Sequence, residues 1–202
     1  MLKWGVSVYW RLKAYLAFLC ICFFTSSVLS HEINIDGKLD DSAWKSADEY
    51  TKYYESLPFT LNEPKDFQKV LILEDEKGIY LGFINKQDKE TIRANRHERD
   101  DEMANADKAG LAIDFDGDGL AAYAFTVSAG GSIADGIYRN ENEVNYDWDA
   151  DWKSGVFVDK DYWYVEMFIP WSIAPMKAVN GEFREVKLSF WRLLAAEWRV
   201  NT

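Results

Sequence analysis

Short apolar segments separated by turn-forming residues recur along most of the chain. Three pairs of these segments flank short turns: residues 69–73 with 79–84, 109–113 with 122–127, and 155–158 with 162–169. The first turn ends at Gly78, where we expect glycine to supply the positive φ that many hairpin turns need. Segments rich in β-branched and aromatic residues on both sides of a turn predict antiparallel hairpins.

The segment 185–192 shows the clearest alternation and is predicted to be the last strand. Its apolar residues share one face of a strand, and the opposite face carries Lys187, Ser189 and Trp191. A strand with one apolar face fits a sheet that buries one side against a second sheet. The pattern therefore predicts an all-β fold, an antiparallel two-sheet β-sandwich of jelly-roll-like form.

One or two short helices are predicted beside the strands. Asp41 and Ser42 are residue types that begin helices, and they precede Trp44. A weaker helical turn is expected within residues 86–107, which are dense in charge and otherwise have the composition of a long loop.

Residues 1–30 have the three parts of a secretory signal peptide. Basic residues precede an apolar run over residues 14–24, and small residues then lead to a cleavage site before His31. The apolar run is shorter than the roughly 20 residues of a membrane span, which disfavours the alternative of an anchor. We expect an exported domain over residues 31–202, periplasmic or extracellular, with no membrane span in the mature chain.

The charge balance narrows the set of partners. The chain has 23 Lys and Arg against 34 Asp and Glu, a net charge of −11, and loss of the predicted leader removes three basic residues to leave −14. This charge argues against nucleic acid and anionic lipid surfaces. Both cysteines lie in the leader, so thiol catalysis, disulfides and Cys-ligated zinc are excluded from the mature domain.

One acidic segment concentrates the aromatic side chains that suit sugar binding. Residues 146–152 place Trp148 and Trp152 among aspartates, including Asp149. An indole offers a flat apolar face to the C–H groups of a sugar ring, and carboxylates accept hydrogen bonds from hydroxyls. The alternative is that Trp152 begins the next strand and points into the core.

Four stretches carry a resemblance to a known family. Residues 35–44, from Ile-Asp-Gly to Trp, resemble the opening "I-D-G-x-x-D-x-x-W" of carbohydrate-binding module family 9. Residues 78–83, 110–116 and 164–171 are similar, in the same order, to its "x-L-Y-L-G-F", "x-x-x-I-D-x-D" and "x-x-E-x-x-I-P-W" strands. Together they cover nearly the whole mature chain.

The resemblance implies a β-sandwich that binds glycans, often with structural calcium, and that commonly accompanies glycoside hydrolases. We therefore predict a carbohydrate-binding domain for a polysaccharide or oligosaccharide, serving polysaccharide breakdown or uptake without catalysing it. A separate glycoside hydrolase is an expected partner. No catalytic pair stands out, because among 34 acidic residues carboxylates at glycosidase spacing arise by chance.

The resemblance also suggests that an arginine near residues 93–101 contacts the sugar. The guanidinium groups of Arg96 and Arg99 can fork across vicinal hydroxyls. The alternative is a solvated loop with internal ion pairs, each worth at most about 1 kcal/mol.

A calcium loop is the metal site to consider. Asp114, Asp116 and Asp118 match its first half and Gly119 stands at the position of its glycine, but the position of the closing Glu holds Phe125. Structural Ca²⁺ completed by carboxylates from elsewhere and a plain acidic turn both remain open.

A haem- or copper-binding redox sandwich is the alternative from another class. The mature N-terminal His31 and His97 contain the ligand types of a copper clamp. A haem would need Met103, Met167 or His97 as axial ligands.

Overall fold

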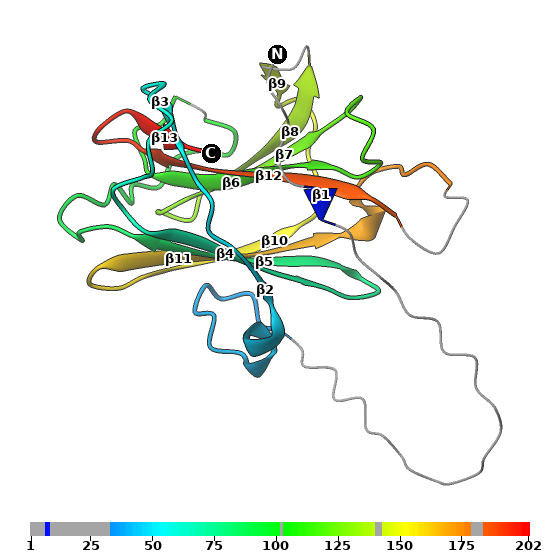
Figure 1. The fold of residues 1–202 in the computed structure, drawn as a ribbon, viewed down its shortest axis with the longest axis horizontal. Helices are drawn as coiled ribbons and strands as arrows, with labels where there is room; N and C mark the ends of the chain where they lie inside the picture. Colours follow the sequence, from blue (N-terminus) through cyan, green and yellow to red (C-terminus); the bar gives the residue numbers. More distant parts are fainter. Residues whose placement is uncertain (1–6, 9–32, 102, 140–142, 179–183) are drawn as a thin grey trace, which may run out of the picture.

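The computed structural model describes residues 7–8, 33–101, 103–139, 143–178 and 184–202, whose strands form two stacked sheets (Figure 1). Sheet A, the upper layer, comprises β1 (Ser7–Val8), β3 (Glu55–Leu57), β6 (Lys108–Asp114), β7 (Tyr123–Ser128), β8 (Ile133–Arg139), β9 (Glu143–Asn145), β12 (Val186–Leu194) and β13 (Arg199–Asn201). Sheet B, the lower layer, comprises β2 (Asp48–Tyr50), β4 (Gln68–Glu74), β5 (Gly78–Lys86), β10 (Lys153–Val158) and β11 (Tyr162–Pro170).

The strand order confirms the antiparallel β-sandwich. Sheet A runs β3-β13-β12-β6-β7-β8-β9, with β1 beside β12, and sheet B runs β10-β11-β5-β4-β2. The predicted hairpins are β4–β5, β6–β7 and β10–β11. The expectation that the segment 185–192 is the last strand was wrong, because β13 follows β12 and pairs with both β12 and β3.

Gly78 serves a different purpose from the one predicted. It is absent from the glycines with positive φ in the described chain, and it is the first residue of β5. A Cβ at Gly78 would lie 2.3 Å from the carbonyl oxygen of Ile169 and 2.8 Å from Cα of Pro170. Glycine is needed here because β11 passes too close for a side chain.

One predicted helix is present, and the second helix of the structure was not predicted. The 3-10 helix η1 (Ser42–Ser46) carries buried Trp44, as predicted, whereas the second, η2 (Trp171–Ile173), follows β11. The described part of residues 86–107 contains no helix, but the backbone N–H groups of Thr91 and Ile92 donate to the carbonyl oxygens of Asp88 (2.9 Å) and Lys89 (3.3 Å) in one helical-type turn. The rest of the loop is held to the sandwich by the buried carboxylate of Asp107, which accepts hydrogen bonds from the backbone N–H groups of Arg93 and Ala195, both at 2.8 Å.

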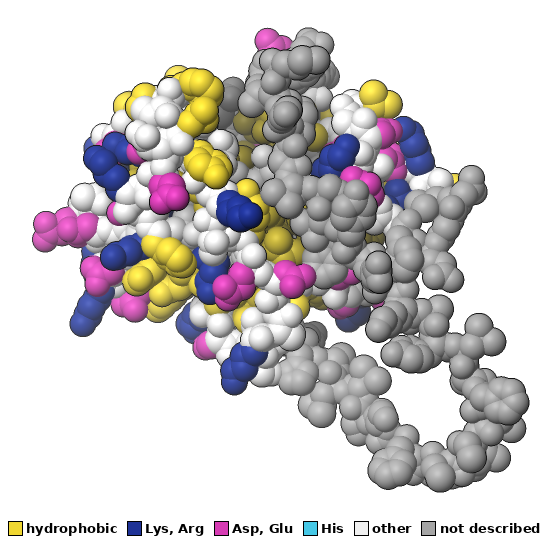
Figure 2. Space-filling model, viewed as in Figure 1, with side chains coloured by type: hydrophobic (Ala, Val, Ile, Leu, Met, Phe, Trp, Pro, Cys, Tyr) yellow, Lys and Arg dark blue, Asp and Glu magenta, His cyan; other side chains and the backbone are white. Residues whose placement is uncertain are grey.

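The core lies between the sheets, where alternate strand residues meet. Phe83, Leu111 and Phe125 have no exposed surface, and neither do Trp163 and Val165. The intervening residues of each strand therefore point outward, so each sheet has an outer face. On the outside, hydrophobic patches are interspersed with charges of both signs (Figure 2).

The N-terminal hook, residues 33–47, covers part of the outer face of sheet B and lies below it in Figure 1. It is held by the buried carboxylate of Glu166, which accepts hydrogen bonds from the backbone N–H groups of Gly37 (2.7 Å), Asp36 (2.8 Å) and Leu39 (3.3 Å) and from the indole of Trp44 (2.9 Å). Burial raises the pKa of Glu166, although these hydrogen bonds oppose the rise. The first and the last of the four family-like motifs, residues 35–44 and 164–171, are thus joined by the hydrogen bonds of Glu166.

Part of the predicted leader is described. Ser7 and Val8 form β1, which pairs with Lys187 and Val186 of β12. Cleavage before His31 stays a prediction. Among the described residues, helices are too short and polar for any of them to span a membrane.

Candidate functional site

The outer face of sheet A carries a small hollow between β12, β6, β7 and β8. Two rows of paired residues cross these strands: Leu193, Lys108 and Ser128 in one, and Trp191, Gly110 and Thr126 in the other. Their neighbours along each strand, such as Leu111 and Phe125, are buried between the sheets. Because side chains alternate along a strand, both rows point away from the core.

Gly110 makes room for the indole of Trp191. A Cβ at Gly110 would lie 2.6 and 2.8 Å from the ring atoms Cζ2 and Cε2 of Trp191. The ring therefore lies directly over the backbone of β6, and the residue stays partly exposed. An aromatic ring held against a sheet loses little conformational freedom when a ligand stacks on it.

His97 stands at the wall of this hollow. Its backbone N–H donates to Oγ of Ser132 at 2.9 Å, and that hydroxyl donates to the carbonyl oxygen of His97 at 2.7 Å. The ring atom Nδ1 lies 2.9 Å from the carbonyl oxygen of Glu98. A carbonyl only accepts, so we assign the hydrogen to Nδ1, which makes Nε2 the acceptor of the neutral ring.

The acceptor of His97 is unsatisfied. Nε2 is buried and has no hydrogen-bond partner among the residues that the structure describes. Buried polar atoms are usually paired, and an unpaired one costs about 1–3 kcal/mol. A ligand with an O–H group to donate would supply the missing partner.

The remaining lining supplies donors and acceptors around the indole. Lys108 is buried, and its Nζ donates to the carbonyl oxygen of Asp101 at 3.1 Å. The hollow, termed the Trp191 pocket, has a volume of about 200 Å³ and is lined by His97, Asp101, Lys108, Thr126, Ser128, Ser132, Ile133, Ala134, Tyr146, Trp191 and Leu193. A flat apolar surface ringed by hydroxyl, amine and imidazole groups suits a molecule that combines C–H faces with hydroxyls.

Trp148 and Trp152 are placed differently from this pocket. Trp152 is 7% exposed and meets Phe125 edge-on, with ring centroids 5.3 Å apart. Trp148 is partly buried against Tyr123, at 5.0 Å between centroids. Sugar binding by these two residues stays a prediction, but burial leaves Trp152 no open face for stacking.

The structure brings Arg99 and Asp149 together and leaves Arg96 apart from them. Arg99 Nε lies 2.8 Å from Oδ1 of Asp149, and its guanidinium also pairs with the buried carboxylate of Asp135. Asp135 accepts the backbone N–H of Ala150 at 2.7 Å. Burial raises the pKa of Asp135, against the effect of these bonds. Arg99 thus clamps two loops to β8, whereas Arg96 is exposed.

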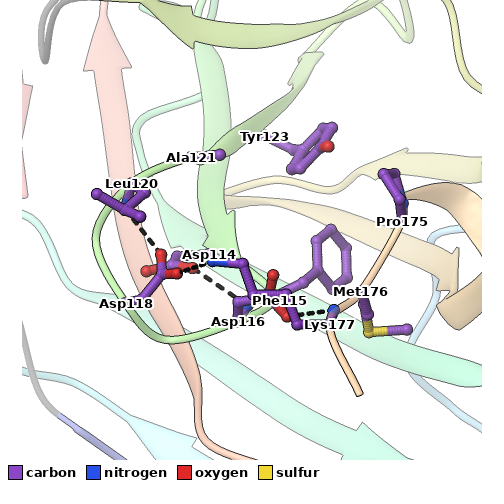
Figure 3. A pocket seen from close by; sticks show the side chains of 10 residues that line it. All are labelled: Asp114, Phe115, Asp116, Asp118, Leu120, Ala121, Tyr123, Pro175, Met176 and Lys177. Atoms are coloured by element: carbon purple, nitrogen blue, oxygen red, sulfur yellow. Dashed lines mark hydrogen bonds and ion pairs between the residues drawn. The ribbon is translucent and has the colours of Figure 1, made fainter. Parts of the chain in front are cut away.

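The three aspartates of the acidic turn surround a larger hollow of about 380 Å³ (Figure 3). Asp114 accepts backbone N–H groups of Asp116, Gly117 and Gly119 at 2.7–3.2 Å. The other two aspartates face cations: Arg184 Nη1 lies 2.7 Å from Oδ1 of Asp116, and Lys177 pairs with Asp118.

The carboxylate oxygens of these three aspartates do not fit a calcium site. Ca²⁺ needs six to eight oxygen ligands, whereas the oxygens of Asp114 are turned to backbone N–H groups and Asp116 and Asp118 are paired with cations. No group of three or more His, Cys, Asp or Glu side chains in the described part of the chain is arranged to hold a metal ion. The geometry favours the alternative of a plain acidic turn.

The calcium question has a direct test. We expect the melting temperature in calcium-containing buffer to stay the same when a chelator is added, because the acidic turn is closed by its own hydrogen bonds and ion pairs. A ligand that binds only the folded state at 100 times its Kd would add about 2.7 kcal/mol, which is easily measured as a fall on chelation. Such a fall would contradict this interpretation.

The candidate redox ligands that the structure describes differ in their exposure to solvent. His31 lies outside the described residues, Met167 is buried in the core, and Met103 is exposed. His97 lines the Trp191 pocket. The redox alternative therefore gains no site from the described residues.

Trp191 was the residue that sequence reasoning passed over. It was placed on one face with Lys187 and Ser189, which is the polar face of that strand. A tryptophan on an otherwise polar strand face was the available indication of a binding surface. The other pocket residues come from separate strands and a loop, and the sequence carries no indication that they meet.

Comparison with solved structures identifies the fold. A carbohydrate-binding module of family 9 from Caldicellulosiruptor kristjanssonii in complex with cellotriose superposes with a TM-score of 0.56 at 14% identity, over 84% of this chain and 77% of that one. The same organism's module in complex with glucose gives 0.57 at 13% identity, over 84% and 79%. A protein from Bacteroides uniformis described as a candidate carbohydrate-binding protein gives 0.52 at 13% identity, over 71% of each chain.

No protein-family model matches the chain, and no curated protein does. At these identities the likeness establishes the fold. The domain is a β-sandwich like that of family 9 carbohydrate-binding modules, as the four motifs suggested.

Proposed function

We propose that this domain binds a neutral oligosaccharide and holds one of its sugar units in the Trp191 pocket. The observation that carries the proposal is the indole of Trp191 over Gly110, beside the unpaired Nε2 of His97. The structural neighbours support the class of ligand, because two of them are modules in complex with cellotriose and glucose.

The binding chemistry follows from the lining. A C–H face of the sugar stacks on Trp191, while a hydroxyl donates to Nε2 of His97 and the ammonium of Lys108 donates to a hydroxyl oxygen. A hydroxyl group can donate a hydrogen bond to Nε2 of His97 and accept one from Lys108. A carboxylate can only accept, so the two side chains together favour hydroxyl groups. The volume of about 200 Å³ is below the roughly 300–1,000 Å³ of pockets that enclose a drug-sized ligand, and so fits one sugar unit of a chain.

Calorimetry with glucose, cellotriose and a panel of other soluble oligosaccharides tests the proposal. We expect at least one of them to bind with a Kd between about 1 μM and about 1 mM. One stacked ring and a few hydrogen bonds give a favourable free energy that is largely offset by the entropy lost when the sugar and the side chains become ordered. A panel in which no sugar binds would refute a carbohydrate role for this pocket.

His97→Ala tests the polar half of the site. We expect a loss of about 1 kcal/mol, or about fivefold in affinity, because the sugar hydroxyl loses its acceptor. His97→Phe should lose as much, since it keeps the ring shape but has no acceptor. Full affinity in His97→Phe would show that Nε2 does not contact the sugar.

We also propose that the domain is exported after cleavage before His31 and that it binds without catalysis, beside a separate glycoside hydrolase. The leader-like residues 1–30 and the absence of a distinguishable catalytic carboxylate pair in the sequence support this role. Sequencing the N-terminus of the exported protein and assaying it for release of reducing sugar tests both parts.

A further inference from the structure

The outer face of sheet B carries a row of aromatic rings that the Trp191 pocket does not use. Phe157 of β10 is paired in register with Tyr164 of β11, and their ring centroids lie 6.2 Å apart at an interplanar angle of 27°. Tyr162 continues the row, 6.0 Å from Tyr164 at 23°. These three residues form what we term the aromatic strip.

The strip faces away from the core. Trp163 and Val165, which alternate with its tyrosines along β11, have no exposed surface between the sheets. Phe157 is 38% exposed, and both tyrosines are partly exposed. Because sheets A and B are stacked on their inner faces, the strip and the Trp191 pocket lie on opposite sides of the sandwich.

The size of the strip decides what kind of partner it fits. A stable protein interface covers about 800 Å² on each partner, whereas an aromatic side chain buries only about 150–250 Å² even when completely covered. Three partly exposed rings therefore fall well short of a protein docking surface. The adjacent turn holds Asp159, Lys160 and Asp161, whose charges of both signs create no strong field to attract a charged partner.

The arrangement of the rings fits a polysaccharide chain. Tyr164 lies within 27° of parallel with Phe157, its partner across the strands, and within 23° of Tyr162, two residues along β11. The cluster therefore exposes apolar ring surface together with the hydroxyl groups of two tyrosines. Successive pyranose rings of an extended chain offer matching C–H faces and hydroxyl edges.

We propose that the aromatic strip is a second contact surface for polysaccharide, so that one domain contacts a polysaccharide assembly on two opposite faces. The inference rests on the proposed function only for the class of ligand. Two contacts on one solid surface or chain network act together through effective concentration, and their combined retention exceeds that of either contact alone by at least about tenfold.

Retention on insoluble polysaccharide, compared with binding of soluble cellotriose, tests this inference. The strip variant is Phe157→Thr with Tyr164→Thr, since threonine suits strands, and the milder Tyr162→Thr is used if the double variant does not fold. Tyr80→Thr is the matched control, because Tyr80 belongs to another ring pair on this face, 4.7 Å from Phe168.

On insoluble cellulose, xylan and chitin we expect the strip variant to lose retention at least about tenfold on the polysaccharide that holds the wild type best. Its affinity for the soluble sugar that fills the pocket should stay unchanged, and Tyr80→Thr should behave as wild type. Retention equal to that of Tyr80→Thr overturns the inference, as does a wild type that none of the three solids retains. If Trp191→Ala is retained while the strip variant is not, the strip stands and the pocket proposal fails.

Discussion

Trp191→Ala is expected to lower the affinity for the bound oligosaccharide about 30-fold. One C–H face of a sugar on the indole removes roughly 80–100 Å² of apolar surface from water, which is worth about 2 kcal/mol. The variant should fold, because the ring lies on the outer face of sheet A over Gly110 and adds nothing to the core between the sheets. Calorimetry gives the affinity, and circular dichroism checks the fold.

Trp198→Ala is the matched control for that experiment. Trp198 is 66% exposed and does not line the Trp191 pocket, so its removal should leave the affinity unchanged. Trp191→Phe should retain part of the affinity, because a smaller aromatic face remains for stacking. Equal affinities in Trp191→Ala and Trp198→Ala would place the sugar elsewhere on the molecule.

Glu166→Ala is expected to destabilise the domain by about 4 kcal/mol. The substitution leaves three backbone N–H groups and the indole N–H of Trp44 without an acceptor, and each unsatisfied buried donor costs about 1–3 kcal/mol, partly relieved by water that enters. For a domain of this size the melting temperature should fall by roughly 8–16 °C. The N-terminal hook should detach first and become sensitive to protease.

Glu49→Ala controls for the loss of a carboxylate on the same sheet. Glu49 makes an exposed ion pair with Lys69 at 2.7 Å, and such surface pairs contribute about 0–1 kcal/mol. A difference of 2–3 °C in melting temperature corresponds to a change in stability on the order of 1 kcal/mol. If the melting temperature of Glu166→Ala lies within that range of the control, the hook does not depend on Glu166.

The local parts of the fold could be predicted from the sequence. The hairpins β4–β5, β6–β7 and β10–β11 join strands that are neighbours in the chain, so their turns and apolar patterns are visible together. Pairings between distant segments leave no such pattern, which is why β3, paired with β13 near the other end of the chain, was missed. β13 forms a hairpin with its neighbour β12, but its three residues are too few to show an alternating pattern. Glu166 is a clear case, because its acceptor role depends on a segment 130 residues earlier.

The candidate site was harder to predict for a related reason. Trp148 and Trp152 attracted attention because aspartates surround them in the sequence, but the structure packs both rings toward Phe125. Trp191 lies in a strand with ordinary alternation, and its position over Gly110 depends on the register between β12 and β6. Composition marks residues that suit sugar binding, whereas register and loop packing decide which of them face a ligand.

The most direct test of the central claim is an indole N–H NMR spectrum of tryptophan-labelled protein during titration with cellotriose, or with whichever oligosaccharide of the panel binds. Trp191→Phe assigns the Trp191 resonance by its disappearance. We predict that this resonance shifts and saturates with the sugar, while those of the buried Trp152 and Trp163 stay in place. A titration in which the Trp148 resonance shifts and that of Trp191 does not would contradict the account.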